Sequence, residues 1–496
     1  MKTPRSASCW VLALIVICYL VLGTLYAVLT PKWQAPDEPA HFNYIKHLAE
    51  KGRLPVLQPG DYPYQYLEEI KAAKFPPSMP ISAIRYESHQ PPLYYALGAL
   101  VYRLTSALGA DVQFLTLRLF SVLLGALVLV TAHQVVCTVF PAKPFLALAA
   151  TAFIAIVPMH ITFTAAINND TLAELVLLLI LWRSVRIVRT SLDARQVMIT
   201  GMLLGLALLT KTTIYVSLGI VAVAVLLHPA PVGGVRSTII RKKVSYLLCA
   251  FIPALLISAP WFARNASIYG NLDILGWQRH DTVVEGQLRT VDFLATVGPA
   301  SYAKAFVFTT FRSFWGQFGW MGVLMDEWLY LALALMSGLL GLGFIAFLIR
   351  VRKAEVVLTP SERASSTVLA ICALTVTMQH LWYNVKFVQH QGRYLFPALG
   401  PIGLAAALGL REMLRPRTAR LLASVLLVGA VSLAAYGVLC NHVATWGLAL
   451  LIAGAVFLAC LAWLPRSSRL APPALYLSFL ALDWLCLSVY IVPYLQ

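Results

Sequence analysis

Two adjacent carboxylates, Asp37 and Glu38, stand just after the first apolar segment of this 496-residue chain. A carboxylate at such a place can take the proton of an attacking hydroxyl group, which is the task of a general base. It can also cap the helix that follows, where the helix dipole stabilises a negative charge by about 0.3–1 kcal/mol. The pair therefore predicts either catalysis or helix capping, and the other polar groups of the chain bear on which role applies.

Further ionisable residues stand at the ends of other apolar runs, where they would lie at membrane depth. Asp170 begins one run, Lys211 occupies a turn between two others, and Arg393 lies in the corner "QHQGRY". Charged groups in or near a bilayer are costly, so each is a candidate for function. Acids suit proton transfer, and cations suit a leaving phosphate. The expected catalytic residues are Asp37, Glu38 and Asp170, and the expected phosphate-binding residues are Lys211, Arg393 and Arg264.

A diproline at Pro91–Pro92 follows the sequence "YESHQ". The first proline keeps Gln90 out of the helical region, and the second suits the first turn of a helix. This geometry aims Glu87, His89 and Gln90 at one spot, although an ordinary transition from loop to helix would have the same pattern. The residues expected to bind the acceptor or to line the cavity are His41, Glu87, His89, Gln90, Tyr94, Asn169, His390 and Tyr394.

The composition places this chemistry in a membrane. Hydrophobic residues make up 59% of the chain and charged residues 12%, whereas soluble domains carry about 25% charged residues. The formal charge of +17 comes mostly from Lys and Arg in short loops between apolar runs, which is typical of loops that face the cytoplasm. The sequence therefore predicts an all-helical polytopic membrane protein, and no nucleic-acid-binding module is visible.

About 13 apolar runs are long enough to cross a bilayer. Counting the stretch 91–108 as a further span would place the arginine-rich loop 183–195 outside, so we expect this stretch to lie along the outer interface. The N-terminus is then cytoplasmic, and two large loops, 30–113 and 263–326, lie outside together with a corner at Asn441–His442. The runs are 10–29, 114–139, 143–163, 169–188, 197–211, 213–228, 244–262, 327–350, 366–384, 394–411, 420–440, 444–464 and 471–492.

The first large loop contains a predicted helix. Between Pro39 and Gly52 apolar residues recur at helical spacing with polar residues between them, which predicts an amphipathic helix on the outer membrane surface. Asp37 or Glu38 would begin this helix, and Gly52 would follow its end. No separate soluble domain or internal repeat stands out, so residues 1–496 are expected to form one transmembrane domain with juxtamembrane helices in its loops.

A series of short motifs runs through about 400 residues of the chain. In order, they include "PDEP", "HQPPLYYALGALVYRL", "NNDTLAEL", "GLALLTKTT", "PWFARNASIYGNLDILG", "SFWGQFGWM" and "QGRYLFPALGPI". This ordered set resembles the GT-C membrane glycosyltransferases. It is most similar to the branch of protein O-mannosyltransferases and aminoarabinose-lipid A transferases. One difference is that Gln90 stands where many of these relatives have His or Lys before the diproline.

The resemblance implies a GT-C-like fold and an inverting glycosyltransferase that works at the outer membrane face. Its donor would be a sugar linked to a polyprenyl phosphate, and its acceptor a hydroxyl group of a lipid, glycan or protein. Asp37 would be the base, with Glu38 as the second choice, and Asp170 would be the acid of the second outer corner. Lys211 and Arg393 would bind the lipid phosphate.

No cofactor is expected from the resemblance. Asp37, Asp170, Glu87 and His89 could together offer ligands to a divalent metal ion, but no spacing signature supports such a site. The compact loops favour a bacterial inner membrane. Two other functions remain open: a transporter or flippase for lipid-linked glycans, and a polymerase or ligase that handles preassembled glycans.

Overall fold

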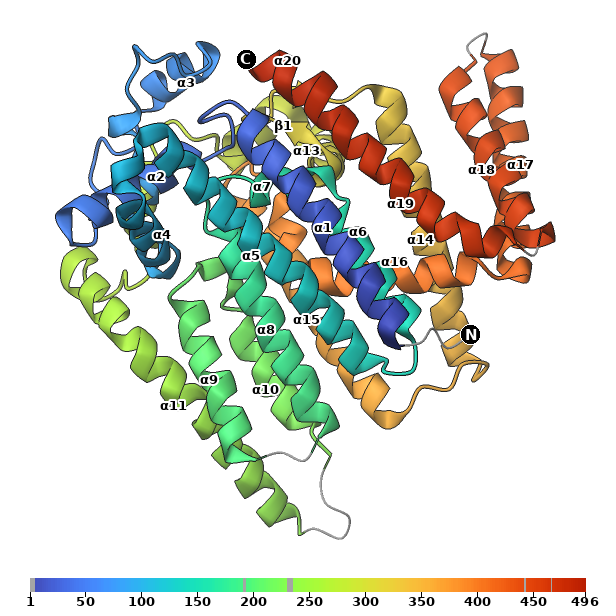
Figure 1. Cartoon of the computed structure of the whole chain (residues 1–496), viewed down its shortest axis with the longest axis horizontal. Coiled ribbons are helices and arrows are strands. Elements are labelled where there is room, and N and C mark those ends of the chain that lie inside the picture. The colour runs from blue at the N-terminus through green and yellow to red at the C-terminus, as the bar shows by residue number, and fades with distance from the viewer. Residues whose placement is uncertain (1–4, 191–192, 230–234, 441–442, 465) are drawn as a thin grey trace.

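Long apolar helices make up most of the computed structural model, which describes residues 5–190, 193–229, 235–440, 443–464 and 466–496 (Figure 1). Within those ranges, nine helical segments are long and apolar enough to cross a membrane. The predicted outer corner at Asn441–His442 lies outside the described residues. The nine are α1 (Arg5–Leu29), α5 (Ala110–Val139), α11 (Arg236–Tyr269), α14 (Glu327–Arg352), α15 (Pro360–Lys386), η5 (Gly392–Ala398) with α16 (Leu399–Met413), α17 (Pro416–Leu439), α18 (Thr445–Trp463), and α19 (Ser467–Leu485) with η6 (Cys486–Ile491) and α20 (Val492–Leu495).

Further helices, outside those nine segments, complete the bundle. α6 (Pro144–Ala155) and α7 (Pro158–Thr164) meet at a 69° bend and would together form a tenth span. They are followed by α8 (Asp170–Arg189), α9 (Ala194–Leu208) and α10 (Ser217–Leu227). A helix or a broken pair thus lies at each predicted apolar run, and the all-helical membrane fold is confirmed. The number of 13 spans is not confirmed, because at 1.5 Å per residue α9 and α10 fall short of a core about 30 Å thick.

Close helix packing fixes the middle of the bundle. α14 and α16 approach so closely that a Cβ atom on Gly409 would lie 2.1 Å from the carbonyl oxygen of Leu340. In the same helix, a Cβ atom on Gly403 would lie 3.0 Å from the carbonyl oxygen of Ala150 in α6. Small residues allow such approaches between membrane helices. Because α16 follows directly from η5, this packing also fixes the position of Arg393.

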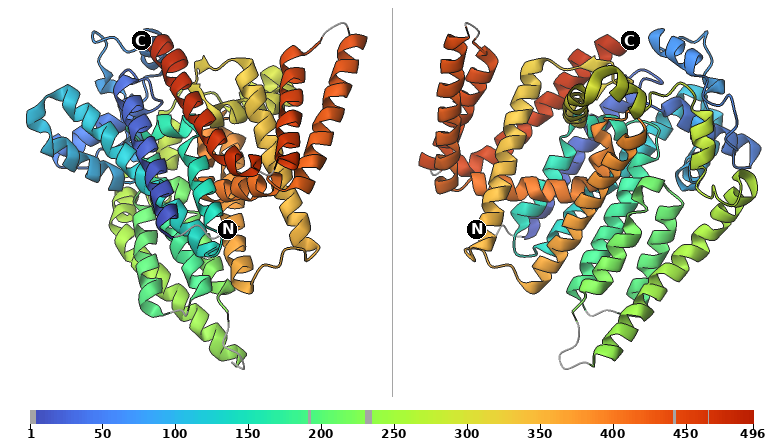
Figure 2. Two further views of the ribbon diagram at one scale, coloured as in Figure 1. Left: turned by 45° about the vertical axis from the view of Figure 1, so that its right-hand side comes forward. Right: turned by 180° about the vertical axis from the view of Figure 1, so that it is seen from behind.

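Short elements from the two large loops gather at one end of the bundle (Figures 1 and 2). Both predicted loops therefore carry helices, as expected. The first loop contains α2 (Glu38–Lys51), α3 (Tyr64–Ala72), η1 (Ile81–Ala83), η2 (Tyr86–His89), α4 (Leu93–Leu104) and η3 (Ser106–Leu108). The second contains α12 (Trp277–Val283), α13 (Thr290–Trp315) and an antiparallel pair of two-residue strands, β1 (Gln317–Phe318) and β2 (Val323–Leu324).

The helix predicted between Pro39 and Gly52 is α2. It ends where Gly52 takes a left-handed conformation, with φ 66°, and donates its N–H to the carbonyl oxygen of Leu48. The buried face of α2 packs on α4, where Gly98 makes room for the side chain of Ile45. α4 has 12 residues, or about 18 Å at 1.5 Å per residue, which is too short to span a bilayer. This length agrees with the predicted interfacial helix.

Candidate active site

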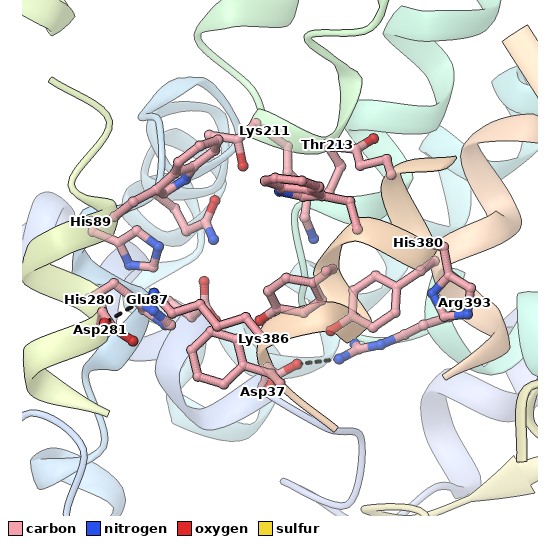
Figure 3. A pocket seen from close by; sticks show the side chains of 18 of the residues that line it. Asp37, Glu87, His89, Lys211, Thr213, His280, Asp281, His380, Lys386 and Arg393 are labelled. Atoms are coloured by element: carbon pink, nitrogen blue, oxygen red, sulfur yellow. Dashed lines mark hydrogen bonds and ion pairs between the residues drawn. The ribbon is translucent and has the colours of Figure 1, made fainter. Parts of the chain in front are cut away.

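A cavity of about 290 Å³ lies among the short helices of the two large loops and the ends of the long helices (Figure 3). Its walls come from the first loop, the turn between α9 and α10, helix α12, the end of α15 and the start of η5. Residues far apart in the sequence thus share one site. The predicted site residues that line it are Asp37, His41, Glu87, His89, Gln90, Lys211, Arg393 and Tyr394.

Asp37 precedes the first turn of α2 in a left-handed backbone conformation, with φ 68° and ψ −8°. Residues other than glycine rarely adopt this conformation and keep it where their surroundings fix it. The side chain forms no capping hydrogen bond to the helix. Instead, one carboxylate oxygen accepts a hydrogen bond from Arg393 Nη2 at 2.6 Å, and the other accepts one from the hydroxyl of Tyr86 at 2.8 Å. A hydrogen-bonded helix cap therefore does not explain this acid.

Arg393 enters the cavity from the first turn of η5. The bend before it depends on Gly392, whose N–H donates to Ser313 Oγ at 2.7 Å. A Cβ atom on Gly392 would lie 2.4 Å from the carbonyl oxygen of Thr310. The guanidinium carbon lies 4.5 Å from the ring centre of Phe163, and Nε has no hydrogen-bond partner among the described residues. The protein therefore leaves part of the donor capacity of Arg393 unused.

Lys211 and Asp170 form a second ion pair, with 2.6 Å between Nζ and Oδ1. Lys211 has an extended backbone just before η4 (Thr212–Ile214), and Asp170 begins α8 with its N–H donated to Asn168 Oδ1. Arg393 Nη1 lies 4.0 Å from Asp170 Oδ2 and so joins this pair to the first one. Two acids and two cations from four distant segments therefore form one cluster.

The two carboxylates of the first loop that line the cavity have opposite pKa shifts. Burial alone would raise the pKa of Asp37, but the positive charge of Arg393 outweighs it and, with His41 and the hydrogen bond from Tyr86, lowers the pKa to about 2. Burial raises the pKa of Glu87, although the charge of His41 opposes the rise. The carboxylate of Glu87 has no hydrogen bond or ion pair in the described part of the chain. Asp37 is thus a paired, fully ionised acid, and Glu87 is an unpaired one.

Two histidines line the side of the cavity away from Arg393 (Figure 3). The ring centres of His89 and His280 lie 4.5 Å apart. Nδ1 of His89 is 3.0 Å from the carbonyl oxygen of Tyr86, which can only accept, so this nitrogen carries the proton. Burial lowers the pKa of His89 to about 4, and burial together with the neighbouring His89 lowers the pKa of His280. Both rings are therefore neutral near pH 7.

Helix α12 contributes cavity residues that the sequence analysis did not identify. Trp277, His280 and Asp281 all face the cavity. Asp281 pairs with Arg289 and, at 3.0 Å, with Lys386 at the end of α15. The one local signal was the polar run after Trp277 in the second large loop. Other lining residues not expected from the sequence are Thr212, Thr213, Gln379, His380, Tyr383 and Phe387.

Glu38, the second acid of the adjacent pair, is fully buried and does not line the cavity. Its carboxylate accepts two hydrogen bonds from Arg118, at 2.8 and 2.7 Å. It also accepts one from the backbone N–H of Trp33 and one from that of Ile167, both at 3.1 Å. Because Ile167 lies just before the corner that contains Asp170, Glu38 ties the first loop to that corner. The role of Glu38 in this arrangement is structural.

The remaining predicted residues lie in or behind the walls. Arg264 donates to a backbone carbonyl of the first loop at 2.6 Å and does not line the cavity. Tyr94 is fully buried, with its hydroxyl 3.1 Å from a serine hydroxyl of α5. Asn169 donates to the side-chain oxygen of Gln90 at 3.4 Å and so supports a lining residue. His390 is buried among aromatic rings of α13.

The polar groups of the cavity do not gather into a metal-binding set. In the ranges that the structure describes, no three His, Cys, Asp or Glu side chains lie close enough together to hold a metal ion. Of the ligands that the sequence offered, Asp37 is bound to Arg393 and Asp170 to Lys211. The positive charge next to these two acids is therefore supplied by side chains.

Solved structures with a similar fold include ArnT from Cupriavidus metallidurans. With undecaprenyl phosphate bound, ArnT is 17% identical over 97% of this chain and 78% of its own, with a TM-score of 0.51. In the apo state the identity is 16%, over 98% and 78%, and the TM-score is again 0.51. AglB, an oligosaccharyltransferase from Archaeoglobus fulgidus solved with an inhibitory peptide and a dolichol-phosphate, is 14% identical over 95% and 56%, with a TM-score of 0.45. The likeness to ArnT shows that this chain has the GT-C fold.

Sequence comparison gives the family. Among proteins with curated functions, none matches the chain significantly. A family model described as "Predicted membrane protein (DUF2142)" matches residues 20–400. That range includes the first loop, the turn at Lys211, helix α12 and Arg393, and so every wall of the cavity. The chain belongs to the DUF2142 family of predicted membrane proteins.

Proposed function

We propose that this protein is an inverting glycosyltransferase that moves a sugar from a polyprenyl-phosphate-linked donor to a hydroxyl acceptor at the extracytoplasmic membrane face. The observation that carries the proposal is the convergence of Asp37, Lys211 and Arg393 on one cavity. Such a reaction needs a carboxylate for the acceptor proton and cations for the departing phosphate. ArnT, which has the same fold, binds undecaprenyl phosphate.

In the proposed reaction, the acceptor oxygen attacks the anomeric carbon of the donor sugar from the face opposite the phosphate. The new carbon–oxygen bond forms as the bond between that carbon and the phosphate oxygen breaks, and the lipid phosphate leaves with the bonding electrons. Asp37 takes the proton from the acceptor hydroxyl. Arg393 binds phosphate oxygens with its planar fork, and Lys211 binds them as a point charge, as negative charge grows on them.

The ion pair between Asp37 and Arg393 links donor binding to the strength of the base. Before the donor arrives, Arg393 keeps the pKa of the buried Asp37 at about 2, so the carboxylate is ionised but weakly basic. A phosphate that shares Arg393 reduces this interaction, and the pKa of Asp37 then rises toward a value better suited to a base. The base therefore gains strength when the leaving group is in place.

We also propose that the reaction needs no metal ion. Arg393 and Lys211 already provide two positive charges at the expected place of the phosphate. A chelator such as EDTA should then leave the transfer rate of the purified protein unchanged. Loss of activity in EDTA that magnesium or manganese restores would contradict this part of the proposal.

For the location we propose a bacterial inner membrane, with the N-terminus in the cytoplasm. The basic segment 236–243 at the start of α11 and the basic end of α14 lie toward the opposite end of the bundle from the first-loop helices (Figure 1). Such segments favour the cytoplasmic side. The cavity would then open on the extracytoplasmic side, where lipid-linked sugars of this kind would be used.

A flippase or transporter for lipid-linked glycans is a less favoured function. Transporters commonly place their charged groups near the membrane midplane at broken helices. Here the charged groups lie under the short helices of the two loops. A glycan polymerase or ligase would use a similar cavity, and it differs in taking a preassembled glycan as the donor.

The test is transfer by the purified protein in lipid nanodiscs. Lipid extracts from a strain that lacks the gene should accumulate one polyprenyl-phosphate-linked sugar, and that lipid is then the donor for the assay. We expect the wild-type protein to release polyprenyl phosphate and to join a single sugar to an acceptor. Movement of the lipid across vesicles without sugar transfer would support a flippase, and transfer of a whole oligosaccharide would support a polymerase. Either result would overturn the proposal.

A further inference from the structure

The cavity has two chemically different ends (Figure 3). One end, here called the cation end, contains Arg393 and Lys211, which the proposed function assigns to the donor phosphate. The other, here called the histidine end, lies around His89 and His280, on the opposite side of the cavity from Arg393. The residues of the histidine end are Glu87, His89, Gln90, Trp277 and His280.

The charges around the histidine end balance one another. Lys386 and Arg289 share the single carboxylate of Asp281, and the remaining positive charge is offset by Glu87. Lys211, whose charge also acts on Glu87 and His89, is paired with Asp170. Glu87 faces the cavity without a hydrogen bond or ion pair in the described part of the chain. A phosphate or carboxylate bound here would meet the unpaired carboxylate of Glu87 and would compete with Asp281 for Arg289 and Lys386. The charge pattern therefore favours a neutral ligand.

The uncharged groups of the histidine end leave both acceptors and donors free. Nδ1 of His89 donates to the carbonyl oxygen of Tyr86, so Nε2 keeps a lone pair for a ligand. The side-chain oxygen of Gln90 accepts from Asn169, which leaves its NH₂ group able to donate. Together with the carboxylate of Glu87, these groups match ligand hydroxyls, each of which can donate one hydrogen bond and accept others.

Aromatic rings border these polar groups. Trp277, the first residue of α12, lines the cavity and is 55% exposed. Tyr383 of α15 and Phe387, just after the end of that helix, line the cavity as well. Flat apolar faces beside a few placed polar groups form a site that fixes the orientation of a ligand with both C–H faces and hydroxyls. A sugar ring has these two properties, and an amino-acid hydroxyl on an extended peptide has no such face.

We infer that the histidine end binds the acceptor and that this acceptor is a neutral carbohydrate, such as the end of a glycan or a glycolipid, rather than a phosphorylated lipid or a protein side chain. The inference rests on the proposed function, which puts the donor phosphate at the cation end. A sugar hydroxyl that points from the histidine end toward Asp37 can give its proton to that carboxylate. Glu87 and Trp277 then determine specificity, because the first disfavours anions and the second contacts the sugar ring.

The test measures binding of three kinds of probe to the full-length protein in nanodiscs, by saturation-transfer NMR for sugars and by native mass spectrometry for lipid. The sugar probes are neutral trisaccharides (maltotriose, mannotriose and chitotriose) and glucose 6-phosphate. The lipid probe is undecaprenyl phosphate. We expect at least one neutral trisaccharide to bind with a dissociation constant at least tenfold lower than that of glucose 6-phosphate. Binding of none of the trisaccharides, or tighter binding of the phosphorylated sugar, would overturn the inference.

Variants separate this inference from the proposed function. Trp277→Ala should weaken trisaccharide binding at least tenfold and leave undecaprenyl phosphate binding within twofold, whereas the exposed Trp10 at the far end of α1 provides the control Trp10→Ala. Arg393→Ala should weaken undecaprenyl phosphate binding at least tenfold and leave trisaccharide binding within twofold. If trisaccharides bind equally well to Trp277→Ala, the acceptor site is wrong and the donor proposal stands. If undecaprenyl phosphate binds Arg393→Ala as well as the wild type, the donor proposal fails while sugar binding is still measured.

A gain of binding makes the test independent of misfolding. Glu87→Gln removes the unpaired negative charge, so the affinity for glucose 6-phosphate should rise about threefold or more while maltotriose changes less. Glu69→Gln on the exposed face of α3 is the matched control and should change neither. Unchanged affinity for glucose 6-phosphate in Glu87→Gln would contradict the role of Glu87 in specificity.

Discussion

Two neighbouring acids, each paired with an arginine, have different surroundings. Glu38 and Arg118 are almost fully buried, and each carboxylate oxygen of Glu38 accepts two hydrogen bonds from the protein. Asp37 keeps a 23% exposed side chain beside the cavity, and its partner Arg393 has an Nε without a partner among the described residues. One pair is saturated and closed off, and the other lines the cavity, where a ligand can reach it.

The difference between these pairs distinguishes a structural ion pair from one that we propose takes part in the reaction. A buried pair avoids a large desolvation penalty only when hydrogen bonds satisfy its remaining polar atoms, and Arg118 achieves this by also donating to three backbone carbonyls. The pair at the cavity lacks this saturation, and Asp37 keeps a left-handed backbone conformation as well. Strained conformations cluster at functional sites, where the surrounding structure maintains them. Adjacent acids can thus serve two different purposes.

The largest expected effect follows from removing the charge of Asp37. Asp37→Asn keeps the shape of the side chain but cannot take a proton, so turnover should fall by roughly 10²–10⁴-fold, the usual contribution of a general base. The thermal unfolding temperature should stay close to that of the wild type. Turnover in nanodiscs and unfolding followed by fluorescence check the two parts.

The matched control for Asp37→Asn is Asp111→Asn at the start of α5. Asp111 is likewise paired with a cation, Lys32, but it is well exposed, so its loss should leave the stability close to that of the wild type. Turnover by Asp37→Asn within a few fold of that of Asp111→Asn would contradict a role for Asp37 as the general base.

Changes to the pair of Glu38 and Arg118 should lower the stability of the protein, whereas Asp37→Asn should lower its turnover. Arg118→Met leaves Glu38 buried without its partner, which should cost about 3–5 kcal/mol of unfolding free energy. The double change Glu38→Leu with Arg118→Met removes both charges and should recover much of this loss. Unfolding in nanodiscs or mixed micelles gives the unfolding free energies of the wild type, the single variant and the double variant. An Arg118→Met variant as stable as the wild type would mean that the pair does not hold the first loop.

Local patterns in the sequence were enough to predict several of the residues that line the cavity. Gly52, the diproline before α4 and the polar groups at the ends of apolar runs act through neighbouring residues, so their consequences can be read without a fold. The predicted helix start at Asp37 or Glu38 was found in α2. The predicted helix ends were found because helix ends depend on short-range chemistry.

The residues that were missed depend on contacts between distant segments. Arg118 was a single basic residue inside an apolar helix, and such a residue needs an acidic partner. The sequence could not indicate that this partner is Glu38 rather than Asp37, because the choice depends on how α5 packs against the first loop. Helix α12 had no periodic or motif signal, and its place beside His89 results from the folding of the second loop.

A smaller effect is expected when Arg393, the residue proposed to bind the donor phosphate, is changed. Arg393→Ala removes a charged hydrogen-bond donor, so the donor KM should rise by roughly 10- to 100-fold, in line with about 1.5–3 kcal/mol for a hydrogen bond to a charged group. The acceptor KM should change much less. Initial rates with each substrate varied in turn provide the measurement.

Arg264→Ala is the control for this variant, because the sequence predicted a phosphate contact and the structure places Arg264 outside the cavity. It should leave the donor KM within about twofold, as expected for a residue that binds no ligand. A donor KM that rises equally in both variants would return Arg264 to the phosphate site and weaken the distinction between saturated and open arginines.

The smallest effect concerns pH and distinguishes Asp37 from Glu87. Without bound donor the pKa of Asp37 is lowered to about 2, so in that state the carboxylate stays ionised down to pH 5 and cannot weaken acceptor binding there. Burial raises the pKa of Glu87, so Glu87 gains a proton at a higher pH than an ordinary glutamate as the solution is acidified. Its loss of charge should weaken trisaccharide binding to the donor-free protein a few fold below neutral pH. In Glu87→Gln this acid limb should disappear, whereas a limb that persists would belong to His41, whose pKa is lowered by burial.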